Sequence, residues 1–233
     1  MSTSEENNKM TAQALALEEF DQQKDQVGTV DVFFDAPGKE ALDEEQIYRA
    51  SAYGLIAALL RSAPDQDMLE RLTGLSPGVV PEGDELLLAM STLALSAKLH
   101  TTASIDDEYH ELFIGLGKGE VVPYGSWYLT GFMMEKPLSD LRDDLARLGY
   151  VRNTSVVEPE DHVAALCEVI SLMITEGVDL STQRNFSQSH MTEWMGRFFA
   201  DLSEAKSAIF YKSVGRFGAA FMAFENEYFS MQT

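Results

Sequence analysis

The segment FYKSVGRFGAAFMAFENEYF, residues 210–229, decides the class of fold. Its bulky apolar side chains recur at spacings of four and three residues, at Phe210, Val214, Phe217, Phe221, Phe224 and Tyr228. This spacing places them along one face of a long helix. An aromatic stripe also fits a cofactor box, but at helical spacing it is far more often part of a core. The segment therefore predicts a long helix with a buried aromatic seam.

The sequence before this segment carries a matching pattern. Met191, Trp194, Phe198 and Leu202 share one helical face. Two helices with such faces can bury them against each other when they run antiparallel. We therefore predict a partner helix over this stretch.

Helical spacing also recurs through the rest of the chain after Asp43, which suits the N-cap of the first helix. The predicted helices cover residues 44–61, 65–72, 84–100, 106–113, 138–148 and 158–174, with a further helix after Pro123 for which Ser126 is a candidate cap. Strand-type alternation never extends beyond a few residues. We therefore predict an all-α fold, a single-domain helical bundle.

Two of these helices have apolar residues along one face. The helix from Asp84 places Leu87, Met90, Ala94 and Ala97 together, and the helix from Pro159 places Val163, Leu166, Cys167, Ile170 and Ile174 together. Proline suits the first turn of that last helix, because its missing N–H would have no partner there. Cys167 is then a core residue and not a nucleophile.

Residues 1–42 differ in composition from the rest of the chain. They are polar and acidic, with one candidate helix around residues 12–26. We read them as an N-terminal extension that packs loosely or not at all, and residues 43–233 as the helical domain. The polar start, MSTSEENNK, lacks the features of a secretory signal, and no apolar run reaches the length of a membrane span. The expected location is the cytoplasm, without stable membrane insertion.

The charge balance limits the partners. The chain has 38 acidic and 17 basic residues, a formal net charge of −21. Such a surface repels nucleic acid and anionic membranes and favours basic partners, although acidity also serves solubility alone. With one cysteine, the chain has neither an internal disulfide nor a cysteine-based zinc frame.

The motifs of common enzymes are incomplete. HELFI, residues 110–114, begins like a zinc-protease helix but has Ile114 in place of the second histidine, and the four histidines show no paired-ligand spacing. The run GLGKGE, residues 115–120, lacks the Ser or Thr that follows the lysine of a phosphate loop. We therefore predict no enzymatic activity, no metal and no cofactor. The alternative is a cofactor-handling or nucleotide-hydrolysing accessory protein that uses this loop and Lys118.

Three segments together resemble the TorD/DmsD/NarJ-like redox enzyme maturation chaperones. They are EYHELF (108–113) followed by Gly115, Gly117 and VPYGSWYL (122–129); EPEDH (158–162), which looks like the family's E-P-x-D-H motif; and HMTEW (190–194) followed by Phe198, Asp201-Leu202, Ala205 and Phe210-Tyr211. Weaker similarity extends back to Tyr48-Arg49 and Tyr53-Gly54-Leu55, so the resemblance covers roughly residues 43 to 229.

The resemblance implies an all-helical cytoplasmic chaperone. Its partner would be a molybdenum-containing oxidoreductase, through the twin-arginine signal peptide or the apo catalytic subunit, held until cofactor insertion and export. A NarJ-like client would lack the paired arginines. The residues that we expect to bind the peptide are Tyr53, Tyr109, Leu112, Phe113, Pro123, Tyr124, Ser126, Glu158, Asp161 and His162.

Within this set, the expected roles differ. Carboxylates such as Glu158 and Asp161 can pair with the planar guanidinium groups of two client arginines, but an acid in a first helical turn can also act only as a cap. The apolar and aromatic residues would line a groove, with core packing as the alternative for Leu112 and Phe113. His162 would orient Asp161 or respond to pH, or it would be a hydrogen-bonded histidine at the helix terminus with no further role. A homodimer that exchanges helices through a hinge at residues 150–157 stays open.

Overall fold

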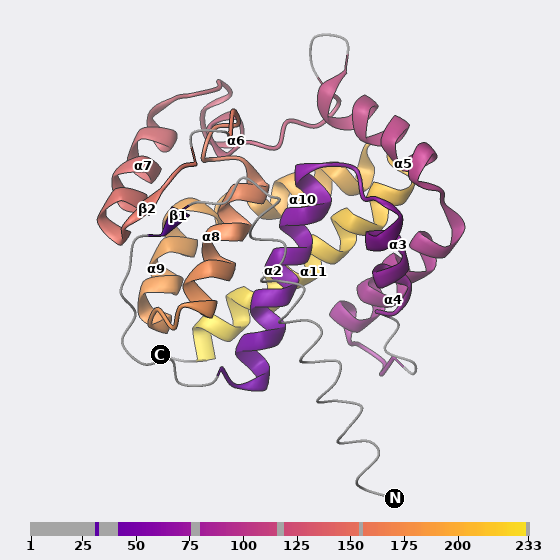
Figure 1. Cartoon of the computed structure of the whole chain (residues 1–233), viewed down its shortest axis with the longest axis horizontal. Coiled ribbons are helices and arrows are strands. Elements are labelled where there is room, and N and C mark those ends of the chain that lie inside the picture. Colours follow the sequence, from indigo (N-terminus) through magenta and orange to yellow (C-terminus); the bar gives the residue numbers. More distant parts are fainter. Residues whose placement is uncertain (1–30, 33–41, 76–79, 116–118, 154–155, 232–233) are drawn as a thin grey trace, which may run out of the picture. The chain divides into compact units, whose positions relative to one another are not determined.

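The computed structural model describes residues 31–32, 42–75, 80–115, 119–153 and 156–231. These residues divide into a smaller unit, formed by residues 31–32, 145–153 and 156–158, and a larger unit, formed by the remainder. Figure 1 shows that helices build the larger unit, as the sequence predicts. The candidate helix at residues 12–26 and most of the proposed extension lie outside the described residues.

Several helices of the larger unit begin where acidic or hydroxyl side chains cap them. They are α2 (Glu44–Arg61), α3 (Gln66–Thr73), α4 (Glu85–Leu99), α5 (Thr102–Tyr109), the π-helix η1 (His110–Ile114), α6 (Gly125–Thr130), most of α7 (Lys136–Leu148), α8 (Val163–Thr175), α9 (Leu180–His190), α10 (Met195–Glu204) and α11 (Phe210–Met231). The carboxylates of Asp43, Asp65 and Asp84 accept backbone N–H groups at the starts of α2, α3 and α4. The first of these caps is the one that the sequence predicts, and α2 has the predicted bounds.

Two details near α4 and α5 differ from prediction. α4 buries Ala89, Leu93, Ala94 and Ala97, whereas Leu87 and Met90 are only half-buried, so the buried face only partly coincides with the one that the spacing marks. The helix predicted from residue 106 begins at Thr102, because Thr101 and Ser104 form a reciprocal capping box.

The core forms where α2 packs along α8 and where α11 packs against α10 and α4 (Figure 1). The five residues predicted as the buried stripe of α8 are all buried, which confirms that prediction, and burial raises the pKa of the Cys167 thiol. Tyr53, Ile56 and Leu59 of α2 are also fully buried. α2 and α8 thus form the centre of the larger unit.

α10 and α11 form a helical hairpin around the aromatic seam. Of the residues predicted to be buried there, only Phe224 is substantially exposed, at 36%. Gly215 lets the two helices approach closely, because a Cβ atom there would lie 2.9 Å from the carbonyl oxygen of Phe199. The predicted pairing of two aromatic helices is therefore confirmed.

The smaller unit contains a short antiparallel ladder. β1 (Asp31–Val32) pairs with β2 (Tyr150–Val151), with Asp31 opposite Val151. Gly149, at a φ of 84°, lies between α7 and β2. The stretch predicted as a loop from residue 150 thus begins with a strand of two residues.

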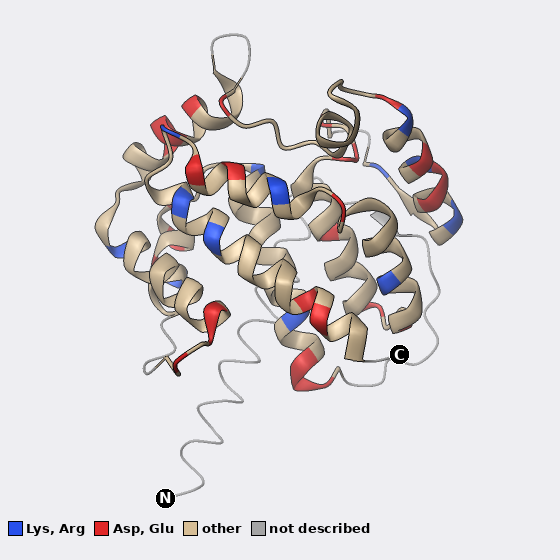
Figure 2. Ribbon diagram, turned by 180° about the vertical axis from the view of Figure 1, so that it is seen from behind, with Lys and Arg blue, Asp and Glu red and all other residues tan. Residues whose placement is uncertain are grey.

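Charged groups are spread over the molecule. In Figure 2, Asp and Glu are distributed over several helices with Lys and Arg among them. In the part of the chain that the structure describes, none of the helices has both the length and the apolar character needed to cross a membrane.

Candidate peptide-binding site

Two segments of the larger unit meet beside the start of α8. The Gly125 N–H donates to the Asp161 carbonyl at 2.9 Å and the Val163 N–H donates to the Pro123 carbonyl at 2.9 Å, which makes an antiparallel bridge between Tyr124 and His162. The structure therefore brings together five of the predicted site residues: Pro123, Tyr124, Ser126, Asp161 and His162.

This bridge corrects two predictions. α8 begins at Val163 and not near Pro159, because the backbone around Asp161 and His162 is used in the bridge instead of a helical turn. Ser126 does not cap α6, since it lies inside the first turn of that helix. Its side chain and backbone point to Asp161 instead.

Asp161 is a buried carboxylate, with only 3% of its surface exposed. Its Oδ2 accepts hydrogen bonds from the Ser126 N–H at 2.8 Å and from the Ser126 hydroxyl at 2.5 Å. Its Oδ1 is buried and has no hydrogen-bond partner among the described residues. Because buried polar atoms are nearly always paired, this oxygen is an acceptor that is available to a donor from outside these residues.

His162 is the N-cap of α8. Its Nδ1 accepts the Ala164 N–H at 3.1 Å, and its ring lies 5.0 Å from that of Tyr124 in an edge-on arrangement. Burial, and to a smaller extent the positive charge of Arg61, lower the pKa of His162 to about 3. The imidazole is therefore neutral at pH 7, and its Nδ1 lone pair serves the helix.

This histidine predicts a loss of stability in mild acid. Because its folded pKa lies below the unfolded value, the unfolded chain binds the proton first as the pH falls below about 6.5. The contribution of neutral His162 to the free energy of unfolding is complete above that pH. As the pH falls further, it declines by about 1.4 kcal/mol per pH unit until the folded pKa of about 3 is reached. Urea unfolding at about pH 7, 6 and 5 measures it.

The matched control is His162→Asn, since asparagine is also a favoured N-cap but does not titrate. We expect the variant to lose less stability than the wild type between about pH 7 and pH 5, by roughly 2 kcal/mol. Equal losses for the two proteins over this range would contradict the neutral, buried histidine.

Two arginine–glutamate pairs flank this site. Arg61 Nε donates to Glu168 Oε1 at 2.8 Å, and Arg142 donates to Glu160 Oε2 from Nε at 2.9 Å and from a terminal nitrogen at 2.7 Å. The hydrogen bond to Glu160, and further the charges of Glu160 and Asp161, raise the pKa of Arg142. Sequence reasoning missed both arginines, since Arg61 and Glu168 are 107 positions apart.

The predicted aromatic wall lies at the end of α2. The Tyr109 hydroxyl donates to the Arg61 carbonyl at 2.9 Å, and the rings of Tyr109 and Phe113 lie 5.9 and 5.4 Å from that of Tyr211. Tyr109 and Phe113 are half-buried, whereas Leu112 is fully buried. Leu112 is thus a core residue, which is the alternative that the sequence left open for it.

The remaining predicted residues are Tyr53 and Glu158. Tyr53 is fully buried on α2 and its hydroxyl donates to Glu225 Oε2 at 3.0 Å, within the core. Glu158 belongs to the smaller unit, where its carbonyl accepts from Arg152 at 3.4 Å. Its part in peptide binding stays a prediction.

The glycine-rich loop has structural reasons for its sequence. Lys118, on which the nucleotide alternative depends, lies outside the described residues. A Cβ atom at Gly119 would lie 2.5 Å from the Leu112 carbonyl oxygen, so the backbone approach requires glycine. The Glu120 carboxylate accepts N–H groups of Lys206 at 2.6 Å and Ser207 at 3.1 Å. Among the described residues, no His, Cys, Asp or Glu cluster suits a metal ion.

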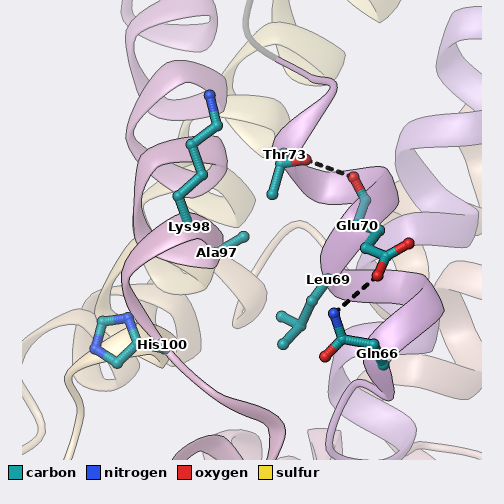
Figure 3. A pocket seen from close by; sticks show the side chains of 7 residues that line it. All are labelled: Gln66, Leu69, Glu70, Thr73, Ala97, Lys98 and His100. Atoms are coloured by element: carbon teal, nitrogen blue, oxygen red, sulfur yellow. Dashed lines mark hydrogen bonds between the residues drawn. The ribbon is translucent and has the colours of Figure 1, made fainter.

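An open pocket of about 320 Å³ lies elsewhere, between α3 and α4 (Figure 3). Its lining residues are Gln66, Leu69, Glu70, Thr73, Ala97, Lys98 and His100. Gln66 and Thr73 both donate to Glu70, and the His100 ring bonds to the Ser96 carbonyl, so several of its polar groups already have partners. None of the predicted site residues lines it.

Comparisons with known proteins cover the same region. A family model described as nitrate reductase delta subunit matches residues 81–200. A chaperone protein TorD from Vibrio atlanticus (strain LGP32) is 24% identical over 203 residues, which is 77% of this chain and 94% of the relative. A chaperone protein TorD from Aliivibrio salmonicida (strain LFI1238) is 24% identical over 200 residues, 75% of this chain and 91% of the relative.

A solved structure is also similar. It is described as a redox enzyme maturation protein from Archaeoglobus fulgidus, is 18% identical, has a TM-score of 0.49, and the match covers 83% of this chain and 99% of that one. The residues matched by the family model include both segments of the candidate site.

Proposed function

The chain belongs to the nitrate reductase delta subunit family, and from this premise we propose that it is a cytoplasmic chaperone for the maturation of a molybdenum-containing oxidoreductase. It binds the twin-arginine signal peptide or the apo form of that client and holds it until cofactor insertion and export. The TorD relatives, named as chaperones, support the general role. The protein performs no catalysis in this role.

The single observation that carries peptide binding is the free acceptor at Asp161. Oδ2 is held by Ser126, so the carboxylate is fixed, while Oδ1 is buried without a partner among the described residues. An arginine supplies planar N–H donors that match this geometry, and hydrogen bonds to a charged group contribute about 1.5 to 3 kcal/mol. Client binding would therefore satisfy an acceptor that has no partner among the described residues.

The neighbouring groups suit the rest of such a peptide. Glu160 adds a second carboxylate beside Asp161, although Arg142 now occupies it. The half-buried Tyr124, Tyr109 and Phe113 offer apolar surface, and the Tyr109 hydroxyl bonds to the Arg61 carbonyl at the end of α2, whereas Pro123 is buried. Because Asp161 is only 3% exposed, the peptide reaches it when the backbone around Asp161 opens locally.

The test is the affinity of Asp161→Asn for a synthetic twin-arginine peptide. We expect a loss of about 1 to 3 kcal/mol, roughly five- to 150-fold, because the uncharged amide forms a weaker pair with guanidinium. Lysines in place of the peptide arginines should weaken binding to the wild type, since an ammonium cannot make the forked contact. Added salt should weaken the original pair more than the variant pair.

The control removes one acidic charge elsewhere: Asp67→Asn, on an exposed position of α3. It should bind the peptide as the wild type does. A melting curve of Asp161→Asn completes the test, because unchanged affinity together with a lower melting temperature would make Asp161 a purely structural residue.

The description of the matching family favours one alternative client. A nitrate reductase subunit whose peptide has no paired arginines fits the NarJ-like branch. Such a client predicts equal affinity for peptides with arginine and with lysine. A pull-down of the bound client from the native host separates the two branches directly.

A further inference from the structure

A turn after α6 exposes three consecutive apolar side chains. In this turn, residues 132–134, Phe132 is 67% exposed, Met133 38% and Met134 70%. An isolated exposed apolar residue is ordinary on a protein surface, but three in sequence on one turn are not. The turn therefore presents a compact apolar surface.

The turn is held in a defined conformation. The Thr130 hydroxyl accepts the Phe132 N–H at 3.2 Å and donates to the Ser126 carbonyl at 2.9 Å. Gly131, at a φ of 83°, ends α6, and its N–H donates to the Trp127 carbonyl at 2.8 Å. Met134 has a φ of 59°, which is unfavourable for a residue with a Cβ atom. Such strain at an exposed apolar residue suggests that its display has a function.

The support of the turn is equally rigid. The Tyr128 hydroxyl donates to Asp201 at 2.8 Å, and Arg197 of α10 donates to the Tyr128 carbonyl at 3.0 Å. α6 is therefore fixed to α10. A ligand that covers the apolar side chains pays little ordering cost on the side of the protein.

The turn and the candidate site lie at opposite ends of α6. Ser126, which bonds to Asp161, is in the first turn of this helix of six residues, and Phe132 follows its end. Six residues at 1.5 Å each separate them by about 9 Å along the helix, a distance that about three residues of extended peptide span.

The charge pattern selects the ligand. Carboxylates of Asp161 and Glu160 lie at one end, and uncharged apolar side chains lie at the other. We propose that residues 132–134 bind the apolar segment that follows the arginines of the client signal peptide. This inference rests on the proposed function and adds the second half of the same site. Methionine suits the role, because its flexible thioether adapts to apolar sequences of different shape.

The experiment compares two variants with two peptides. The turn variant is Phe132→Ser with Met134→Asn, since asparagine tolerates the left-handed conformation. The matched control is Leu95→Ser with Leu99→Asn on α4, where the leucines are 57% and 72% exposed. The first peptide carries two arginines and an apolar run; in the second, Ser and Gly replace that run. Fluorescence anisotropy gives the affinities.

We expect the turn variant to bind the first peptide about five- to fifty-fold more weakly than the wild type, and the second peptide equally well. The control should match the wild type with both peptides. If the wild type prefers arginine over lysine but the turn variant binds the first peptide normally, the inference falls and the proposed function stands. If the wild type binds neither peptide, both fall.

A lipid surface is the competing ligand. Binding of the wild type, but not of the turn variant, to phosphatidylcholine vesicles, with unchanged affinity for the first peptide, would overturn the proposal and assign the turn to a membrane.

Discussion

Arg49→Met should lower the free energy of unfolding by about 3 to 5 kcal/mol, because it leaves a buried carboxylate without its counter-charge. Arg49 of α2 and Glu225 of α11 are 1% and 0% exposed. Arg49 Nε and a terminal nitrogen donate to the two Glu225 oxygens at 2.7 and 2.8 Å. Burial alone would lower the pKa of Arg49, but the hydrogen bonds and charge of Glu225 outweigh it and raise the pKa.

The surroundings of this pair explain why the loss is large. The other terminal nitrogen of Arg49 donates to Gln46 at 3.0 Å and to Gln183 at 3.1 Å, and the guanidinium lies 4.3 Å from the Tyr228 ring centre. One side chain therefore joins α2, α9 and α11. Its removal breaks contacts with all three helices.

A double-mutant cycle tests the pair with the single variants Arg49→Met and Glu225→Leu and with the double variant that combines them. The double variant should be less destabilised than the sum of the two single variants by about 2 kcal/mol or more, since no unpaired charge remains. The exposed pair Lys136–Asp140 is the control, because Lys136→Met should change stability by less than about 1 kcal/mol. Urea unfolding measures all of them. Strict additivity of the Arg49 and Glu225 variants would contradict the pairing.

The helices could be predicted from the sequence because their signals are local. A capping aspartate and the apolar spacing lie within one helical turn of the boundary that they define, which is why α2 has the predicted bounds. α9 was not predicted, since its sequence LSTQRNFSQSH has few apolar residues to show a period. The start of α8 was wrong because a tertiary bridge, invisible to local patterns, takes up the backbone of Asp161 and His162.

The candidate site was partly predictable for a related reason. The EPEDH and VPYGS motifs identified segments that the structure brings together, and Asp161 and His162 lie beside Ser126 and Tyr124. Tyr53 was misplaced, because its partner Glu225 is 172 positions away and no local pattern indicates a buried ion pair. Arg61 and Arg142 were missed because their partners, Glu168 and Glu160, are 107 and 18 positions away and lie beyond one helical turn.

Glu108, a residue of the EYHELF motif, has a structural role that the sequence did not indicate. Glu108 opens the EYHELF segment and is 6% exposed. Its carboxylate accepts the N–H groups of Ile209, Phe210 and Tyr211 at 2.8, 3.0 and 2.7 Å. A residue of α5 thus caps α11, where a negative charge also favours the helix dipole.

Glu108→Ala should therefore lower the free energy of unfolding by about 3 to 5 kcal/mol, because three hydrogen bonds to a charged group disappear and buried N–H groups lose their acceptor. The stability of Glu108→Gln should fall between those of the wild type and Glu108→Ala, since the amide oxygen still accepts hydrogen bonds but carries no charge. Glu111→Ala, at an exposed position of the same segment, is the control and should stay within about 0.5 kcal/mol of the wild type.

Amide hydrogen exchange adds a local readout: in Glu108→Ala the amides of residues 209–211 should exchange faster than those in the middle of α11. Wild-type protection at these three amides, together with an unchanged urea midpoint, would show that α11 does not depend on this cap.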